Sequence, residues 1–293
     1  FAKMLFKKSK YAAISAILFA VDFMHYTQSR IATIDTYAVF FLILMYGCMA
    51  VFLDTDLKTA TLRQICLPLF FCGVFFGLGA AAKWTALYGG LGLAFLFFYR
   101  LFRTANQTPK AERPALLRRY RALILWCCLF FLIIPACLYS AAYLPVFTVT
   151  GHSYREFFSY QAKMYSYHAT LDATHTFSSA WYEWPILKRP VWYHITWAEN
   201  TADGLTHSIS ALGNPIIWWG SIATMLLSAV WGLLYRDRRA AFLWVGYLSV
   251  YLPWVGVTRI AFLYHYYTAV PFLILSMVWV LSFTHQQIRQ KPK

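Results

Sequence analysis

Two oppositely charged side chains stand five residues apart in the stretch HYTQSRIATIDTYAVFF. Arg30 and Asp35 lie here between two strongly apolar runs, where charged residues are rare. A guanidinium group binds phosphate oxygens through parallel hydrogen bonds, and a nearby carboxylate can fix its conformation. The pair therefore suits a lipid phosphate. Two structural explanations are also open: an ion pair that anchors two helix ends, or Asp35 as the cap of a helix beginning at Thr36.

Two further stretches place a lone cation among aromatic residues at the edge of an apolar run. In KWTALYGG, Lys83 is followed directly by Trp84. In RIAFLYHYY, Arg259 precedes His265 and Tyr266. Lys83, Arg259 and His265 are candidates to contact a phosphate, and Trp84 and Tyr266 are candidates to contact a sugar or an acceptor. The alternative is that lysine extends its amine to the lipid headgroups and that the aromatic residues belong to a membrane-interface belt.

The composition identifies the elements that must position these residues. Of the 293 residues, 60% are hydrophobic and only 13% are charged, whereas an average soluble domain has about 25% charged residues. Apolar runs of about 17 to 25 residues recur along the chain, and this length allows a helix to cross a bilayer. The sequence therefore predicts an all-α polytopic membrane protein with about eight transmembrane helices. The predicted spans are residues 11–27, 36–53, 64–82, 86–101, 121–143, 215–234, 240–257 and 263–283.

The basic residues are distributed unevenly between the predicted spans. Most of the 26 Lys and Arg residues fall in alternate connecting segments, which the positive-inside rule places in the cytoplasm. The net charge of +15 is thus explained by topology and by contact with anionic lipid headgroups, and it requires no nucleic acid. Arg30, Lys83 and Arg259 all fall on the opposite, outer side. One carboxylate, Asp22, lies inside the first predicted span and is a functional candidate for that reason.

The predicted organisation has three parts: transmembrane helices in 1–143, an exoplasmic loop in 144–214, and C-terminal helices with a basic cytoplasmic tail in 215–293. The loop is rich in aromatic residues. Its part 154–168 has the apolar spacing of an amphipathic interfacial helix, whereas the Pro-punctuated WYEWPILKRPVWYH is predicted to be irregular. Sugar C–H faces pack on aromatic rings, so this loop could contact a sugar or an acceptor; membrane anchoring is the alternative. The candidates are Trp181, Glu183, Trp184 and Arg189.

Metal-binding and nucleotide-binding patterns do not occur in the sequence. No HExxH or CxxC-type spacing predicts a metal site, and no GxGxxG or Walker pattern is present. All six Cys residues lie in or beside apolar runs, and we interpret them as small buried apolar side chains rather than a disulfide framework.

Four blocks of the sequence resemble, in this order, the protein O-mannosyltransferase family, which is glycosyltransferase family 39 with the GT-C fold. The blocks are DFMHYTQSRIATIDTYAVFFLILMY, GLGAAAKWTALYGGLGLA, ATHTFSSAWYEWPILKRPVWY and FLYHYYTAVPF. The resemblance implies a membrane enzyme that transfers mannose, with inversion, from a polyprenyl-phosphate carrier to Ser or Thr hydroxyls on the outer side. It implies that Arg30 lies near the carrier phosphate with Asp35 as its companion acid. Other residues fall in shared blocks without an assigned role: Lys83, Trp84, Glu183, Trp184, Arg189, His265 and Tyr266.

The catalytic residues are left unassigned. Members of the family carry an Asp-Glu pair in the first outer loop, where a carboxylate is expected to take the acceptor proton. The chain starts FAKMLFKKSK, which we interpret as a fragment, and we expect that pair upstream of residue 1. Seventy or so residues in the outer loop leave no room for the β-trefoil domain of eukaryotic members. This implies a bacterial form in the plasma membrane, or the endoplasmic reticulum membrane if the chain is eukaryotic.

The predicted partners are a lipid-linked donor, polyprenyl-phosphate-mannose, a secreted or translocating protein acceptor, and membrane lipids. The resemblance leaves a divalent cation open. Two other functions remain as alternatives. A related GT-C enzyme would glycosylate a lipid or glycan acceptor, and a non-catalytic transporter or flippase would place its functional charges near the middle of the bilayer.

Overall fold

The computed structural model describes residues 1–171 and 173–290, and these residues are mostly helical. Position 172 of the predicted outer loop and residues 291–293 of the predicted tail lie outside the described residues. Six helical segments are long and apolar enough to cross a membrane. They are Ile34–Asp54 (α4), Leu62–Ala82 (α5), Thr85–Asn106 (α6), Arg113–Thr150 (α7 to α9), Pro215–Leu234 (α11) and Leu263–Ile288 (chiefly α13). The prediction of an all-α polytopic membrane protein is confirmed.

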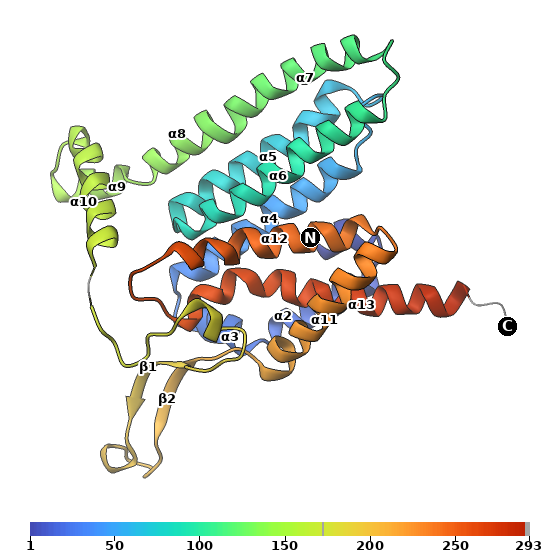
Figure 1. The fold of residues 1–293 in the computed structure, drawn as a ribbon. Helices are drawn as coiled ribbons and strands as arrows, with labels where there is room; N and C mark the ends of the chain where they lie inside the picture. Colours follow the sequence, from blue (N-terminus) through green and yellow to red (C-terminus); the bar gives the residue numbers. More distant parts are fainter. Residues whose placement is uncertain (172, 291–293) are drawn as a thin grey trace.

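The other elements, including the parts of the two composite segments, are shown in Figure 1. They are α1 (Ala2–Phe6), α2 (Ser9–Ala20), α3 (Phe23–Arg30), α7 (Arg113–Cys128), the π-helical segment Leu129–Ile133, α8 (Ile134–Ala141), α9 (Leu144–Thr150), α10 (Phe157–Thr170), β1 (Val191–Thr196), β2 (His207–Ala211), α12 (Arg238–Tyr251), α13 (Val270–Gln290), and 3-10 turns at Tyr154–Glu156, Trp181–Glu183, Ala198–Asn200, Leu252–Gly256 and Leu263–Ala269.

Two of the eight predicted spans are shorter than predicted. Residues 11–27 do not form one helix, because Asp22 ends the run: its side chain accepts a hydrogen bond from the backbone N–H of His25 at 3.2 Å and caps α3. The run therefore divides into α2, of 12 residues, and α3, of 8 residues. Neither reaches the roughly 20 residues that a helical span needs.

The other short span lies at 240–257. Here α12 has 14 residues and continues as the 3-10 turn Leu252–Gly256. Pro253 lies in this turn, and proline cannot donate the backbone hydrogen bond that an α-helix requires. The apolar character of the run continues past the point at which the α-helix ends.

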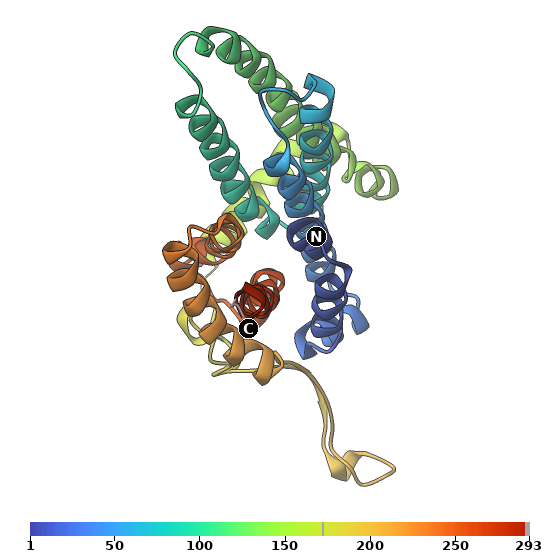
Figure 2. The ribbon, with the colours of Figure 1, turned by 90° about the vertical axis from the view of Figure 1, so that its right-hand side faces the viewer.

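Helix α13 lies at the centre of one half of the bundle, with α11 and α12 on one side and α2 on the other (Figure 2). Phe272 and Trp279 of this helix are both fully buried. A helix that is apolar on all sides is expected at such a position. Gly246 lets α12 pack closely against the Phe272 side chain of α13, because a Cβ atom at Gly246 would lie 2.2 Å from the Phe272 ring.

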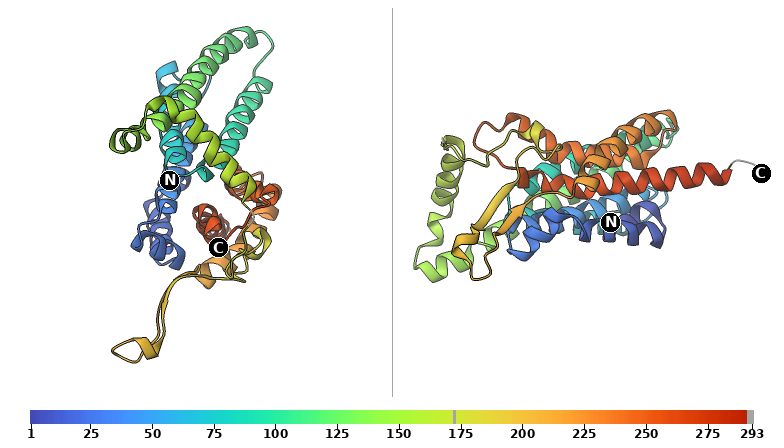
Figure 3. Two further views of the ribbon diagram at one scale, coloured as in Figure 1. Left: turned by 90° about the vertical axis from the view of Figure 1, so that its left-hand side faces the viewer. Right: turned by 90° about the horizontal axis from the view of Figure 1, so that it is seen from below.

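The outer segment contains more regular structure than predicted. Residues 157–170 form α10, so the helix predicted at 154–168 is confirmed, while its place at the membrane interface remains a prediction. The end of the stretch 181–194, predicted to be irregular, instead belongs to strand β1, which pairs antiparallel with β2. The resulting hairpin projects from the helices (Figure 3). Its strands escaped the prediction because the partner strand lies beyond an intervening loop.

Asp22 joins the start of α3 to the start of α11. This carboxylate is fully buried. Its Oδ2 accepts hydrogen bonds from the Trp218 indole N–H at 2.9 Å and from the Asn214 backbone N–H at 3.2 Å. Buried charges persist only where such donors satisfy them. The observed geometry gives this carboxylate a structural contact that orients α3 and hence Arg30 at its far end.

Replacing Asp22 by alanine should lower the free energy of unfolding by about 3 kcal/mol, since it leaves buried donors without an acceptor. Thermal unfolding in detergent micelles measures this as a decrease in Tm. Asp54→Ala is the matched control, because Asp54 forms an exposed ion pair with Lys7, and exposed pairs contribute about 1 kcal/mol or less. Equal decreases for both variants would contradict the structural role of Asp22.

Candidate functional site

The site at the end of the bundle that is predicted to be the outer end is built around an ion pair between Asp35 and Lys83. Asp35 lies in the first turn of α4 and is buried. Lys83 follows the last residue of α5, and its Nζ lies 2.6 Å from Asp35 Oδ1. The ammonium group also lies over the Tyr264 ring, 5.5 Å from its centroid. Since only 19% of the Lys83 side chain and 10% of the Asp35 side chain are exposed, the pair is shielded from bulk water.

This pairing corrects the predicted partnership of Arg30 with Asp35. It also corrects the position of the helix cap, because α4 begins at Ile34 after Thr33. Asp35 therefore lies within the first turn, where a negative charge interacts favourably with the helix dipole.

Arg30 lies beside the ion pair but does not join it. It is the last residue of α3, is exposed, and stacks its guanidinium over the Tyr26 ring at 5.6 Å. It forms no ion pair with any residue that the structure describes. The turn that carries it is well fixed: Thr33 donates to Gln28 Oε1 at 2.5 Å, and Gln28 Nε2 donates to the Tyr193 hydroxyl at 2.9 Å. The Arg30 guanidinium thus remains available to a ligand.

Arg259 brings a second cation to the same end. Arg259 lines an open cavity together with Trp254, whose ring centroid lies 4.4 Å from that of His265. Arg259 also acts on His168 of α10, where burial first and then this charge hold the pKa of His168 below its usual range. His265 Nδ1 lies 3.0 Å from both the backbone nitrogen and the carbonyl oxygen of Phe262, which fixes the ring against this turn. Lys83, over the Tyr264 ring, thus lies against the segment 254–266 that also carries Arg259.

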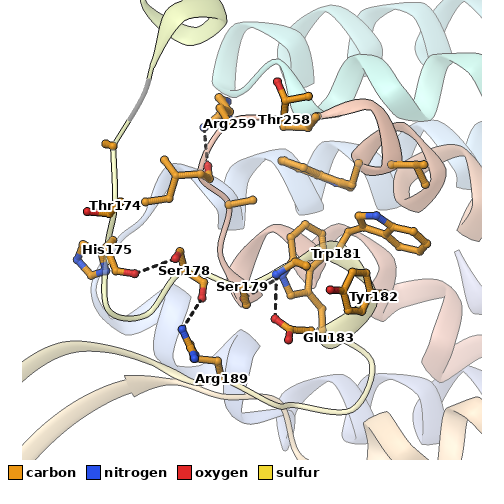
Figure 4. Close-up of a pocket in the computed structure, with 18 of the residues that line it drawn as sticks. Thr174, His175, Ser178, Ser179, Trp181, Tyr182, Glu183, Arg189, Thr258 and Arg259 are labelled. Carbon is orange, nitrogen blue, oxygen red and sulfur yellow. Dashed lines mark hydrogen bonds between the residues drawn. The ribbon is translucent and has the colours of Figure 1, made fainter.

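An open cavity of about 1000 Å³ adjoins Arg259. The segments 173–184 and 254–261 form its walls, and Arg189 reaches it from the start of the hairpin (Figure 4). Trp181 and Tyr182 also contribute to the lining, and Tyr182 is 63% exposed. The cavity has the size of a ligand site and combines aromatic surface with charged groups.

Glu183 and Arg189 stabilise the loop that forms this cavity. Glu183 forms an ion pair with Lys188 and accepts the Ala180 backbone N–H at 3.0 Å. The Lys188 hydrogen bond, followed by the Ala180 N–H, holds the pKa of Glu183 below its usual range. Arg189 donates to the carbonyl oxygen of Ser178 at 3.2 Å (Figure 4). The predicted sugar or acceptor contacts of both residues stay predictions.

The predicted aromatic contacts differ in accessibility. Trp184 and Tyr266 are 0% and 2% exposed, and Trp184 donates its indole N–H to Ser179 Oγ at 3.1 Å. A sugar could reach either ring only if neighbouring residues moved. Trp181 is half-buried in the cavity wall. Trp84 is half-buried too, and its ring centroid lies 6.1 Å from that of His168.

Two family models match the chain along almost its full length. Residues 1–150 match the model described as dolichyl-phosphate-mannose-protein mannosyltransferase. Residues 153–293 match the model of the C-terminal four-transmembrane region of protein O-mannosyltransferase. The chain belongs to the protein O-mannosyltransferase family. The resemblance found in the four sequence blocks is thereby confirmed.

Individual members of the protein O-mannosyltransferase family align with most of the chain. A protein of Mycolicibacterium smegmatis named polyprenol-phosphate-mannose--protein mannosyltransferase is 26% identical over 339 residues, covering 100% of this chain and 64% of the relative. A protein of the same name from Mycobacterium tuberculosis is 25% identical over 320 residues, covering 92% and 60%. Protein O-mannosyltransferase 1 of Drosophila pseudoobscura pseudoobscura is 28% identical over 171 residues, covering 52% and 18%. The chain therefore spans less than two thirds of the length of these relatives. No solved structure matches it.

Several residues of this protein O-mannosyltransferase site escaped the sequence analysis. Tyr264 contacts Lys83, and its position next to His265 was the available signal. Gln28 and Tyr193 form a hydrogen bond between segments that are far apart in the sequence, so neither local sequence stretch predicts this contact. Burial of Trp254 against His265, with ring centroids 4.4 Å apart, was likewise not evident from the sequence.

The Cys side chains of this family member differ in their burial. No group of three or more His, Cys, Asp or Glu side chains gathers as a metal site in the part of the chain that the structure describes. All six Cys residues are free. Cys72 is buried as predicted, whereas Cys128 and Cys137 are exposed on the outward surface of α7 and α8, so the prediction that all six are buried was wrong.

Proposed function

We propose that this chain contributes to transfer of mannose from a polyprenyl-phosphate carrier to Ser or Thr hydroxyls of proteins. The observation that carries the proposal is the shielded Lys83 ammonium, held by Asp35 and lying over Tyr264 in the segment that also carries Arg259. Family membership and the names of the mycobacterial relatives support the same donor and acceptor. These bacterial relatives also favour a plasma-membrane location.

The chemistry requires a site for developing negative charge. In the transfer, the bond between the mannose anomeric carbon and the phosphate oxygen breaks, and its electron pair leaves with the phosphate. The acceptor hydroxyl oxygen forms the new bond, and a carboxylate takes its proton. Cations positioned beforehand at the phosphate stabilise the transition state most strongly where water is excluded. Lys83 and Arg259 meet this requirement in the proposal.

Asp35 has a positioning role in this proposal. Lysine has three donors, so its hydrogen bond to Asp35 leaves two for phosphate oxygens while fixing the direction of the side chain. Because Asp35 is engaged with Lys83 at 2.6 Å, we do not assign it as the base that takes the acceptor proton. Arg30 would contact the phosphate from the margin, where its guanidinium is exposed.

The acceptor would enter through the open cavity between 173–184 and 254–261. Its volume of about 1000 Å³ is at the upper end of ordinary ligand pockets, which suits an extended polypeptide segment. Trp181 and Tyr182 offer apolar surface in its wall, and Arg259 also lines it. Arg259 belongs to the same segment as Tyr264, whose ring lies under the Lys83 ammonium group. We therefore propose a secreted or translocating protein as the acceptor.

The test uses the protein in liposomes with radiolabelled mannosyl-phosphoryl-polyprenol and a Ser/Thr-rich peptide. We expect label on the peptide, and none on a matched peptide with Ala at every Ser and Thr. Label on an added lipid or glycan, with none on the peptide, would keep the donor and overturn the proposed acceptor. Solute uptake without sugar transfer would overturn the enzymatic proposal.

Arg259→Gln should raise KM for the lipid donor about ten-fold, because one charged contact to the carrier phosphate is lost. Steady-state transfer rates at varied donor concentrations measure this change. Arg155→Gln is the matched control, since Arg155 is exposed on the same side and does not line the cavity. An unchanged KM in Arg259→Gln would remove Arg259 from the carrier site.

A further inference from the structure

A second cavity opens at the opposite, basic end of the bundle. It has a volume of about 380 Å³. It lies between the first half of α5 and the middle of the segment Arg113–Thr150, which we call the α7 arm. Arg63 is its one charged lining residue. About 30 Å of helix separates Arg63 from Lys83 at the other end of α5, so this groove is distinct from the site described above. The lining residues are Leu62, Arg63, Cys66, Leu67, Phe70, Trp126 and Phe130.

Packing at one end of the groove gives it a closed floor. A Cβ atom on Gly73 of α5 would lie 2.1 Å from the Phe130 carbonyl oxygen, so the two helices touch there. Phe130 belongs to a π-helical segment, and such segments are rare and frequently occur at functional positions. The Phe130 ring stacks on Trp126 at 5.8 Å and meets Phe70 edge-on at 5.6 Å. From this floor towards Arg63, the small Cys66 side chain leaves the space open.

The mouth of the groove is positively charged. Arg63 is exposed and forms no hydrogen bond or ion pair with any residue that the structure describes. Arg119 of α7 donates to the Lys58 carbonyl oxygen at 2.9 Å. Two further cations, Lys58 and Arg119, therefore lie at the turn that precedes α5. The acid of this turn, Asp56, is already engaged by Thr59 at 2.7 Å and by the Lys58 backbone N–H.

We propose that this groove binds one anionic phospholipid, with an acyl chain against Trp126 and Phe70 and its phosphate at Arg63. Both walls belong to segments long and apolar enough to cross a membrane, so an acyl chain matches the apolar lining of the groove. Basic pockets between transmembrane helices at the positively charged side select anionic headgroups. The uncompensated Arg63 supplies that selectivity. The bound lipid bridges α5 and the α7 arm, whose residues Leu125 and Leu132 are 72% and 63% exposed.

Trp126 provides a direct probe, because brominated acyl chains quench an indole that they contact. The protein is placed in phosphatidylcholine vesicles that contain increasing fractions of brominated phosphatidylglycerol or brominated phosphatidylcholine. The difference from the Trp126→Phe variant isolates the Trp126 signal. We expect half-maximal quenching at a mole fraction about five-fold lower for phosphatidylglycerol. Arg63→Gln should abolish this preference.

Arg118→Gln is the matched control, since Arg118 is an exposed cation of α7 that does not line the groove; it should keep the preference. Equal quenching by both lipids, or an equal loss in Arg63→Gln and Arg118→Gln, would overturn the proposal in favour of ordinary boundary lipid. Cys66→Phe fills the groove and should weaken quenching of Trp126 by both lipids. Undiminished quenching in that variant would place the chain outside the groove and would also overturn the proposal.

Discussion

Replacing Lys83 by methionine should lower mannose transfer by at least about 100-fold, the size of effect seen when one preorganised charge-stabilising donor is removed. Methionine keeps much of the side-chain volume and removes the ammonium group. The variant should also lose about 3 kcal/mol of stability, because Asp35 is left buried without its partner. Initial rates of peptide labelling and the Tm in micelles measure the two effects.

A double variant separates the catalytic effect from the structural one. Asp35→Asn combined with Lys83→Met removes the unpaired charge, so the Tm should recover most of its loss while transfer stays low. If transfer recovered together with the Tm, Lys83 would act only by stabilising the ends of α4 and α5. Low transfer with a recovered Tm supports a direct contact of Lys83 with the carrier phosphate.

Arg30→Ala should reduce transfer about 100-fold and leave folding intact. The guanidinium is exposed and its only described ring partner is Tyr26, and such a cation–π contact at an exposed site is worth about 0.5–1 kcal/mol. The Tm should therefore change little. The measurement pairs transfer rates with thermal unfolding of the same preparation.

Arg30→Lys is the matched control for charge. It keeps the positive charge and loses the two-pronged contact, so transfer should be intermediate between that of the wild type and that of Arg30→Ala. Normal turnover in Arg30→Ala would remove Arg30 from the mechanism. A large decrease in Tm would instead assign it a structural role.

The long spans could be predicted because their apolar runs are long and uninterrupted. Residues 36–53 and 64–82 were predicted from hydropathy alone, and the structure places α4 and α5 within a few residues of them. The run at 11–27 looked equally apolar, but Asp22 caps a new helix inside it. That capping is stable because distant Trp218 satisfies the same carboxylate at 2.9 Å, and local sequence carries no trace of this partner.

The site was predictable in its residue types and not in its pairings. Lone cations beside aromatic residues pointed to Lys83, which the structure pairs with Asp35, and to Arg259, which lines the open cavity. The choice of Lys83 as the partner of Asp35 depends on how the turn after α5 lies against α4, across 48 residues of sequence. Spacing along the chain favoured Arg30 as the partner instead, because Arg30 is only five residues from Asp35. Proximity in sequence shows which residues can meet, but not which of them do.

Photocrosslinking would test the central claim most directly, namely that the carrier phosphate binds between Lys83 and Arg259. A polyprenyl phosphate with a diazirine beside its phosphate is added to the protein in vesicles, irradiated, and mapped by peptide mass spectrometry. The account predicts crosslinks in segments 83–88 and 257–264 that excess unlabelled polyprenyl phosphate prevents and that Lys83→Met largely removes. Crosslinks at the basic end of the bundle, or crosslinks that Lys83→Met leaves unchanged, would contradict it.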